Sequence, residues 1–447
     1  MDIDSIDTTV PTLGKSKIQS PIRADNEDTR GLFFVSDQDR VLIDINQANM
    51  EDRIRRGLKI PSFEVAGPRA KIYFDPSKLR CAMVTCGGLC PGLNDIIRSI
   101  VLELYHAYGV HHIYGARYGL QGFIPAYGHE FMNLTPESVS DIHNMGGTVL
   151  GSSRGPQPIE EVVDCLERMN IRLLFMIGGD GTLRAASLIV NEITARNLKI
   201  SVVSIPKTID NDIYLVARSF GFETAVSVAT QAIVAAHNEA KGYPNGIGLI
   251  KLMGRYSGFI AASAAIAQQD VNFVLIPEAD FDLHGKDGLL DAVEKRLQER
   301  KHAVIIVAEG AGQKFFKDKA EARDESGNMR LMDIGRYLKK EILAYFKSKN
   351  IETTVKYIDP SYMIRSLPAN ASDNVYCSFL GRDAVHAGMA GKTGLLVGHW
   401  NNRFVHVPMS ASVGKHKQVS PDGTLWLNVL AATGQGALRN SSKDLVS

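Results

Sequence analysis

The 447-residue sequence lacks an excess of charge of either sign, because 50 lysine and arginine residues stand against 49 aspartate and glutamate residues. This balance provides no long-range field that would attract nucleic acid or an anionic membrane. Also missing are an apolar run of the roughly 18 to 20 residues that span a bilayer, an apolar signal core at the acidic start, and a peroxisomal signal at the end. We therefore expect a soluble cytoplasmic protein that binds neither nucleic acid nor membrane, and in which charge recognition is local.

Cysteine is scarce as well. Five cysteines in so long a chain do not form a disulfide framework. Cys81, Cys86 and Cys90 lie close together in the sequence, but their spacing is not the paired C-x-x-C of a typical zinc site. We favour buried positions at a strand edge for Cys81 and Cys86 over a metal site.

The pattern of apolar residues indicates an α/β protein. A chain of 447 residues exceeds the about 100 to 200 residues of one typical core, so two or more domains are expected. Residues 1–78 are polar and contain prolines at positions 61, 68 and 76, which predicts an extension with little core of its own. From Cys81 onward, short apolar runs alternate with longer periods of helical type.

The predicted strands are Cys81–Cys86, His112–Ala116, Leu173–Ile177, Ser201–Ile205, Gly248–Met253, Phe273–Ile276 and Ala303–Ala308. The predicted helices are Gly92–Tyr108, Ile159–Met169, Leu183–Ala195, Thr224–Asn238, Gly258–Ala267, Leu289–Arg300, Asp333–Lys347 and Asn374–Ala387. Strands rich in Val, Ile and Leu that alternate with helices predict βαβ units and a parallel sheet covered on both faces. Ligands of such sheets collect at the carboxyl ends of the strands.

Two strand-end loops combine glycine with features that suit phosphate. In Thr85-Cys-Gly-Gly-Leu-Cys-Pro-Gly-Leu-Asn94, Gly87 and Gly88 would let a ligand approach the backbone, and the next helix would offer free amides to an anion. A simple tight turn is an equal alternative there. In Ile177-Gly-Gly-Asp-Gly-Thr182 a carboxylate sits inside the glycine turn, as expected where a divalent cation is held against phosphates. We favour that interpretation over a structural turn.

Two further loops carry charge directly after a strand. Ile205-Pro-Lys-Thr-Ile-Asp-Asn-Asp212 contains a lysine and two aspartates, and Lys251-Leu-Met-Gly-Arg-Tyr256 ends a strand with an arginine where a helix begins. Such an arginine is usually a surface residue or an ion-pair partner, and phosphate binding is an open alternative to these roles.

Two other motifs are rejected. Gly388-Met-Ala-Gly-Lys-Thr393 has His386 where a Walker loop needs glycine, and no G-x-G-x-x-G follows the first strand.

Taken in this order, Gly-Gly-Leu-Cys-Pro-Gly-Leu-Asn, Gly-Gly-Asp-Gly-Thr, Pro-Lys-Thr-Ile-Asp-Asn-Asp and Met-Gly-Arg closely resemble the 6-phosphofructokinases. More narrowly, the sequence is similar to the branch with an N-terminal extension, which includes trypanosomatid ATP-dependent enzymes and bacterial relatives. The resemblance covers about residues 80 to 410. It implies a phosphofructokinase-type α/β fold, with two Rossmann-like parallel-sheet domains flanking a cleft. The implied domains are an extension (1–78), a nucleotide-binding domain (79–221 with 364–415) and a sugar-phosphate-binding domain (222–363 with 416–447).

The resemblance also implies a reaction. The γ-phosphoryl group of ATP would pass, with Mg²⁺, to the C1 hydroxyl of fructose 6-phosphate, the committed step of glycolysis, in an allosteric homo-oligomer that is usually a tetramer. The implied nucleotide-binding residues are Gly87, Arg154, Gly155, Gly179, Asp180, Gly181 and Thr182, with Asp180 on the metal. The implied sugar-binding residues are Thr208, Ile209, Asp210, Met253, Gly254, Arg255, Glu309, Tyr362, Met363, Ile364 and Arg365. Among these, Asp210 would be the general base, and Tyr362 and Arg365 would hold the 6-phosphate; we expect Asp212 to support the base.

The choice of donor depends on Gly181 and Lys207. In this family an aspartate directly after Gly-Gly-Asp marks pyrophosphate users, because its carboxylate would occupy and repel the space of the ATP α-phosphate. Lys207, in Pro-Lys-Thr, is typical of pyrophosphate users. A lysine supplies charge to either donor whereas an aspartate would exclude ATP, so Gly181 decides in favour of ATP.

Two rival functions remain to be weighed. NAD and lipid kinases share Gly-Gly-Asp-Gly-Thr but lack the other motifs, and a catalytically silent sensor would be marked by loss of Asp180 or Asp210, which are both present. The chain departs from the short bacterial enzymes at Pro244-Asn-Gly246, and Lys356 stands near the place of a phosphate-binding arginine. A lysine cannot reproduce a bidentate fork, so cross-subunit binding of the sugar phosphate stays open.

Overall fold

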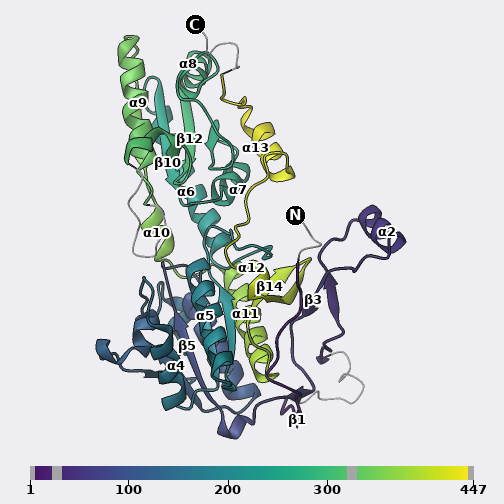
Figure 1. The fold of residues 1–447 in the computed structure, drawn as a ribbon. Helices are drawn as coiled ribbons and strands as arrows, with labels where there is room; N and C mark the ends of the chain where they lie inside the picture. The colour runs from purple at the N-terminus through teal and green to yellow at the C-terminus, as the bar shows by residue number, and fades with distance from the viewer. Residues whose placement is uncertain (1–5, 23–32, 320–329, 441–447) are drawn as a thin grey trace. The chain divides into compact units, whose positions relative to one another are not determined.

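The computed structural model describes residues 6–22, 33–319 and 330–440, and the chain divides into two compact units (Figure 1). Unit 1 comprises Met1–Thr208, Ile213–Gly221 and Ser366–Lys415. Unit 2 comprises Ile209–Asp212, Phe222–Arg365 and His416–Ser447. The parts of the predicted domains at 1–5, 23–32, 320–329 and 441–447 lie outside the described residues. The assignment of nucleotide to one domain and sugar phosphate to the other stays a prediction.

The sheet of unit 1 has nine strands within the described residues, in the order β2-β3-β15-β14-β9-β8-β5-β6-β7. Its central strands β14, β9, β8, β5 and β6 are parallel, whereas β2, β3, β15 and β7 join antiparallel at the edges. The strands are β2 (Arg40–Leu42), β3 (Ser62–Val65), β5 (Arg80–Thr85), β6 (His112–Ala116), β7 (Met132–Asn133), β8 (Leu173–Gly178), β9 (Ser201–Pro206), β14 (Leu395–Trp400) and β15 (Arg403–Pro408). The prediction of a parallel sheet is therefore confirmed for the centre and is wrong at the edges.

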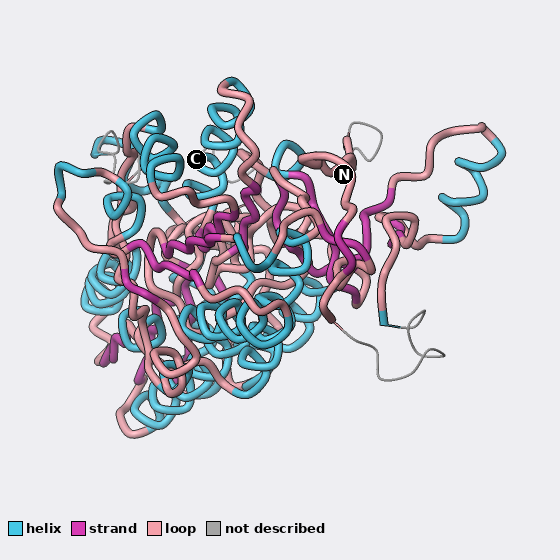
Figure 2. The backbone as a smooth tube through the Cα atoms, turned by 90° about the horizontal axis from the view of Figure 1, so that it is seen from below, coloured by secondary structure: helices cyan, strands magenta, loops and turns pink. Residues whose placement is uncertain are grey.

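Helices cover both faces of this sheet, and Figure 2 shows them in cyan around the magenta strands. One pair, α4 (Ile159–Arg168) and α5 (Asp180–Ala195), packs with the alternate strand residues Leu174 and Met176 in one apolar cluster. The other pair, α3 (Leu93–Leu102) and α11 (Ala371–Met389), packs together, with Gly388 of α11 against Leu173. Every residue of β8 and β9 is buried, as expected for central parallel strands.

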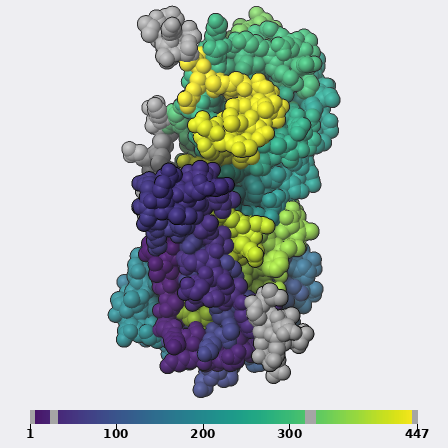
Figure 3. All heavy atoms as spheres, turned by 90° about the vertical axis from the view of Figure 1, so that its right-hand side faces the viewer, coloured from purple at the N-terminus to yellow at the C-terminus, as the bar shows by residue number. Residues whose placement is uncertain are grey.

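The N-terminal extension adds to the core of unit 1 instead of forming one of its own. Strand β3 pairs with β15, and in Figure 3 the purple extension lies against the yellow-green segment that contains β14 and β15. Phe63 of β3 is fully buried in a cluster with Ile6, Ile43 and Leu396. The described part of the extension also contains β1 (Ile18–Gln19), which pairs with β4 (Lys71–Ile72), and α2 (Gln47–Arg55), which has no buried residue.

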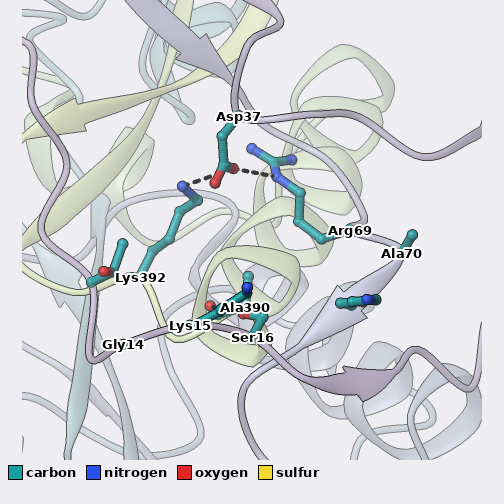
Figure 4. Close-up of a pocket in the computed structure, with 10 residues that line it drawn as sticks. Gly14, Lys15, Ser16, Asp37, Arg69, Ala70, Ala390 and Lys392 are labelled. Carbon is teal, nitrogen blue, oxygen red and sulfur yellow. Dashed lines mark hydrogen bonds and ion pairs between the residues drawn. The ribbon is translucent and has the colours of Figure 1, made fainter.

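The side chain of Lys392 forms ion pairs with the N-terminal extension beside a cavity of about 530 Å³ (Figure 4). Its buried Nζ lies 2.7 Å from Oε2 of Glu64 and 3.0 Å from Oδ1 of Asp37, which also accepts from Nε of Arg69 at 2.9 Å. Lys392 follows α11 and precedes β14, so its surroundings differ from the strand–loop–helix order of a Walker loop. The structure thus supports the rejection of that motif.

Unit 2 is built on a four-stranded parallel sheet in the order β11-β12-β10-β13. Its strands are β10 (Gly246–Leu252), β11 (Phe273–Leu275), β12 (His302–Ala308) and β13 (Thr354–Ile358). Its helices include α6 (Phe222–Lys241), α7 (Phe259–Gln268), α8 (Leu289–Arg300), α9 (Ile334–Ser348), α10 (Ser361–Arg365) and α13 (Thr424–Thr433). The carboxyl ends of β10, β12 and β13 are therefore neighbours at one edge of this sheet.

Candidate active site

In unit 1, the loops predicted to bind the phosphate donor follow the carboxyl ends of the neighbouring strands β5, β8 and β9. Lys207, the first residue after β9, is buried, and its backbone N–H donates to the carbonyl of Gly178 at 2.9 Å. Its Nζ donates to the carbonyl of Gly88 at 2.6 Å. Lys207 therefore joins the loop after β9 to the end of β8 and to the loop after β5.

Small residues let these loops approach one another. Gly87 has φ of +83°, and a Cβ added there would lie 3.5 Å from Nζ of Lys207. A Cβ at Gly178 would lie only 2.1 Å from Oγ1 of Thr182, so glycine lets α5 begin directly after β8. The cap residue Gly179 offers no side chain to the first amides of α5. A helix start of this kind binds anions, because its N–H groups and the helix dipole face the ligand.

Asp180 opens α5 with a partly exposed carboxylate. Its Oδ2 lies 2.8 Å from Nη2 of Arg184, one turn along the helix, and its Oδ1 accepts weakly from the backbone of Gly414 at 3.3 Å. A carboxylate has about four lone-pair positions, so these contacts leave room for a cation. The next residue, Gly181, faces open space, since nothing lies within 4 Å of an added Cβ.

Arg154 and Gly155 reach the same edge of the sheet. The preceding residue Ser153 accepts the backbone N–H of Gly87 at 3.1 Å, and a Cβ on Gly88 would lie 3.6 Å from Nη2 of Arg154. The structure therefore brings the predicted nucleotide-binding residues of unit 1 to one place. Arg184 and Gly414 were missed by sequence reasoning, because no motif contains them.

In unit 2, the loops after β10 and β12 are joined by backbone hydrogen bonds. The N–H of Glu309 donates to Leu252 at 2.9 Å, and that of Gly310 donates to Gly254 at 3.0 Å. Gly254 has φ of +125°, and a Cβ there would lie 2.4 Å from the carbonyl of Ser257, so this turn requires glycine. Met253, Gly254, Arg255 and Glu309 thus gather at the edge predicted for the sugar.

Asp210 lies against these loops. Its Oδ2 accepts the backbone N–H of Arg255 at 3.2 Å, and its carbonyl accepts Oγ of the fully buried Ser257 at 3.1 Å. Burial and the neighbouring charges of Asp212 and Glu309 raise the pKa of Asp210 to about 7, against smaller opposing effects of the Arg255 amide and Arg365. A carboxyl group with a pKa near neutrality is suited to accept a proton from a substrate.

Asp212 is held by the C-terminal segment of unit 2. Its carbonyl accepts the backbone N–H of Lys417 at 2.8 Å, and Nδ1 of His416 lies 3.7 Å from its Oδ2. Burial lowers the pKa of Lys417 to about 8, although Asp212 opposes this shift. Ser257, His416 and Lys417 were not predicted, and the Met-Gly-Arg motif beside Ser257 is the signal that could have drawn attention to it.

Comparison with known proteins decides the family. The family model described as Phosphofructokinase matches residues 80–388, which is more than half of the chain. The chain belongs to the phosphofructokinase family.

Individual members of the phosphofructokinase family match over almost the full length. The ATP-dependent 6-phosphofructokinase of Borreliella burgdorferi is 50% identical over 439 residues, which are 97% of either chain. The enzyme of the same name from Amycolatopsis methanolica is 47% identical over 438 residues, covering 96% of this chain and 95% of that one. The solved pyrophosphate-dependent phosphofructokinase of Marinobacter aquaeolei superposes with a TM-score of 0.65 at 17% identity, over 81% of this chain and 93% of that one, and it shows the fold alone. The predicted phosphofructokinase-type fold is confirmed.

Not every residue expected from the phosphofructokinase motifs lies at the loops described above. Arg365 ends α10 and is close enough to Asp210 to affect its pKa, and Ile364 is fully buried. Tyr362 and Met363, however, are 83% and 69% exposed in this chain, so their predicted contacts with a sugar phosphate stay predictions. Lys356 is engaged locally, since its Nζ lies 3.2 Å from Glu239.

Thr208 and Ile209 lie in the chain between Lys207 and Asp210. The carbonyl of Thr208 accepts Oγ of Ser219 at 2.7 Å, and Ile209 is buried. Their predicted contacts with the sugar are likewise still predictions.

The predicted burial of Cys81 and Cys86 is confirmed, since Cys81 lies in β5 and Cys86 directly follows that strand. All five cysteines are buried and none forms a disulfide. Burial raises the pKa of the Cys81 thiol far above its usual range and that of Cys86 to about 12, so neither is a ready thiolate. In the described parts of the chain, no group of three or more His, Cys, Asp or Glu side chains is arranged to hold a metal.

Among the described residues, every helix is too short or too polar to span a membrane.

Proposed function

We propose that this phosphofructokinase transfers the γ-phosphoryl group of ATP to the C1 hydroxyl of fructose 6-phosphate, with Mg²⁺, and so forms fructose 1,6-bisphosphate. The observation that carries the proposal is the partly buried carboxyl group of Asp210, which has a pKa of about 7 and lies beside the loops that follow β10 and β12. The name shared by relatives that are 47% and 50% identical over nearly the full chain agrees with this activity.

The sugar hydroxyl is a poor nucleophile and needs a proton acceptor. Asp210 takes the proton of the C1 hydroxyl as the new O–P bond forms, while the bond between the γ-phosphorus and the β–γ bridging oxygen breaks and ADP leaves. The Arg255 amide orients the carboxylate through Oδ2. Burial, and after it the charges of Asp212 and Glu309, keep the pKa of Asp210 high, so that the base is matched to neutral pH. The Arg255 guanidinium and Arg365 bind the sugar phosphate through charge-assisted hydrogen bonds. Tyr362, Met363 and Ile364 belong to the same proposed pocket.

The donor is bound by unit 1. Gly87, Gly88 and the start of α5 present backbone N–H groups to the phosphates, and Arg154 adds a positive charge beside them. Asp180 would hold Mg²⁺ through its remaining lone pairs, and the metal would supply positive charge against the negative charge that develops during transfer. One protein carboxylate suffices, because Mg²⁺ is usually bound by one or two carboxylates together with substrate phosphates and water.

ATP is the proposed donor rather than pyrophosphate. The open space at Gly181 supports this choice, since no side chain of that residue competes with the α-phosphate. Lys207 is compatible with either donor: its Nζ at the Gly88 carbonyl adds positive charge among the donor loops. The likeness to the Marinobacter aquaeolei enzyme does not bear on the donor at 17% identity.

We also propose that the enzyme is a cytoplasmic, allosteric homotetramer, on the basis of family membership. Light scattering would then give a mass four times that of one chain.

A coupled assay tests the proposed reaction. Purified protein is mixed with fructose 6-phosphate, Mg²⁺ and either ATP or pyrophosphate, and fructose 1,6-bisphosphate is measured. We expect turnover with ATP and little with pyrophosphate. Turnover with pyrophosphate alone would overturn the choice of donor, and no product with either donor would overturn the function.

A further inference from the structure

The cavity of about 530 Å³ beside Lys392 is formed entirely by residues of unit 1 (Figure 4). One wall belongs to the N-terminal extension, with residues from the segments 12–16 and 69–71 and with Asp37. The other wall is the segment 390–392, which connects α11 to β14. Pockets that bind small molecules typically have volumes of about 300–1,000 Å³. The cavity is therefore large enough for a small ligand.

This cavity lies at the opposite end of β9 from the candidate donor loops. The carbonyl of Lys392 accepts a hydrogen bond from Oγ of Ser201 at 2.6 Å, and Ser201 is the first residue of β9. Lys207 and the rest of its loop follow the last residue of the same strand. The cavity is thus separate from the loops of unit 1 that are proposed to bind ATP.

Positive charge predominates around the cavity. Its charged lining residues are the cations Lys15, Arg69, Lys71 and Lys392 and the anion Asp37. Burial would raise the pKa of Asp37, but hydrogen bonds from Lys392 and Arg69 lower it, so this carboxylate is ionised at neutral pH. For Glu64 as well, burial would raise the pKa, but hydrogen bonds from His406 and Lys392 lower it. Four cations against these two carboxylates leave an excess of two positive charges.

The guanidinium group of Arg69 keeps donors beyond those used inside the protein. Its Nε donates to Asp37 at 2.9 Å, and Nη1 and Nη2 donate to the carbonyls of Gly67 at 2.8 Å and Val65 at 3.0 Å. A guanidinium group has five N–H donors. These three bonds fix the orientation of the Arg69 side chain, and within the described residues two of its N–H groups remain for a ligand.

The lysines of the cavity also have donors left. The ammonium group of Lys392 has three N–H donors, and its ion pairs with two carboxylates occupy two of them. Lys15 and Lys71 are exposed, and neither side chain has an ion pair or hydrogen bond with any residue in the described part of the chain. The two charges in excess therefore belong to Lys15 and Lys71.

We propose that this cavity binds a small metabolite through its phosphate monoester group, with Lys15 and Lys71 balancing the charge of the phosphate. Such a group carries about −1.5 to −2 charge at neutral pH, which matches the excess of two positive charges. Arg69 and Lys392 add charge-assisted hydrogen bonds to the phosphate oxygens. The remaining volume accommodates the organic part of the ligand.

A ligand bound in this way would link the extension to the segment 390–392. It would contact Lys15, Arg69 and Lys71 on one wall and Lys392 on the other. A ligand that binds the folded chain raises its stability by an amount that grows with the ligand concentration relative to Kd. The melting temperature is therefore expected to rise with the ligand, and this readout does not depend on catalysis.

The test is calorimetric titration of the purified chain with glycerol 3-phosphate and, in a second arm, with inorganic phosphate. The double variant Lys15→Met/Lys71→Met removes the two charges, and Lys15→Arg/Lys71→Arg keeps them. The matched control is Lys17→Met/Lys59→Met, which removes two exposed lysines of the extension that do not line the cavity. Melting curves in phosphate-free buffer show that each variant is folded. Binding at the active site is common to all variants, so the cavity accounts for what Lys15→Met/Lys71→Met loses.

We expect Lys15→Met/Lys71→Met to weaken the binding of glycerol 3-phosphate about 10- to 100-fold and to lose the associated rise in melting temperature. The arginine variant and the control should retain both. Equal binding by the natural chain and the folded Lys15→Met/Lys71→Met variant would overturn the proposal. An equal loss in Lys17→Met/Lys59→Met would also overturn it, because binding would then follow net charge alone. Tighter binding of inorganic phosphate than of glycerol 3-phosphate would contradict the assignment to a monoester and identify free phosphate as the ligand.

Discussion

The backbone N–H of Arg255 donates to Oδ2 of Asp210 over 3.2 Å, so the turn after β10 holds the carboxyl group that follows β9 in the sequence. This contact favours the ionised form of Asp210, whereas burial and the charges of Asp212 and Glu309 favour the protonated form. The balance raises the pKa of Asp210 to about 7. A general base at this position is ionised above that pH and protonated below it.

The first prediction concerns the acid limb of the pH profile. Asp212→Asn removes one negative charge that raises the pKa of Asp210, so the carboxylate should persist to lower pH. The acid limb of kcat, near pH 7 in the natural enzyme, is expected to move to lower pH. Steady-state assays across pH 5 to 9 measure this shift. Asp422→Asn, which removes an exposed acid of unit 2, serves as the control and should leave the limb in place; an unmoved limb in Asp212→Asn would contradict the assignment of Asp212.

The second prediction concerns stability. Because the folded-state pKa of Asp210 is raised above its ordinary value of 3.8, its contribution to stability is fully present below that value and is lost as pH rises through about 7. Asp210→Asn removes the partly buried charge and should therefore raise the melting temperature by a few degrees at pH 8, and by little at pH 5. Calorimetry at the two pH values makes the comparison. An equal rise in melting temperature at pH 5 and pH 8 would mean that the pKa of Asp210 is not raised in the folded protein.

The third prediction separates charge from size at Gly181. A side chain at this position meets open space, so Gly181→Asp should fold normally while its carboxylate repels the ATP phosphates. We expect kcat/KM for ATP to fall by about 10²-fold or more, which corresponds to about 2.7 kcal/mol. Gly181→Asn has the same shape without the charge and should keep most of the activity with ATP. Equal losses in both variants would show that volume, not charge, excludes ATP.

The fourth prediction concerns the ion pair between Lys392 and Glu64, which links the N-terminal extension to the rest of unit 1. Lys392→Met leaves the carboxylate of Glu64, which is only 8% exposed, without its ammonium partner. Breaking one side of a buried ion pair costs about 3–5 kcal/mol. Denaturant unfolding should show a loss of this size, whereas Lys15→Met, a change at an exposed lysine of the same cavity, should cost little. A loss below 1 kcal/mol in Lys392→Met, on the scale of a surface ion pair, would mean that Lys392 does not hold the extension.

Much of the fold follows from local sequence, because central parallel strands are apolar along their whole length. Strands β8 and β9 were predicted to within one residue for this reason. Strand β13 was missed, since it is an edge strand in which only Val355 is buried. The hairpin of β14 and β15 was missed although its turn residues, Asn401 and Asn402, have positive φ of 44° and 61°, a recognised hairpin signal.

The candidate site follows from sequence only where short motifs mark it. Glycine and aspartate at strand ends predicted the loops around Asp180 and Asp210. The contacts of Ser257 and Lys417 with the loop 209–212 could not be predicted, because they join segments far apart in the chain and involve ordinary residue types. The raised pKa of Asp210 likewise results from burial and from Glu309 in a separate segment as well as from Asp212 in its own loop, so the motif alone does not predict it.

The most direct test of the account is the kcat of Asp210→Asn with ATP and fructose 6-phosphate at pH 8, where the natural carboxylate is ionised. Removal of a general base typically costs about 10²- to 10⁴-fold. We predict a loss of kcat in that range with the KM for fructose 6-phosphate changed little. A kcat within about threefold of the natural enzyme would contradict the role of Asp210 as the base.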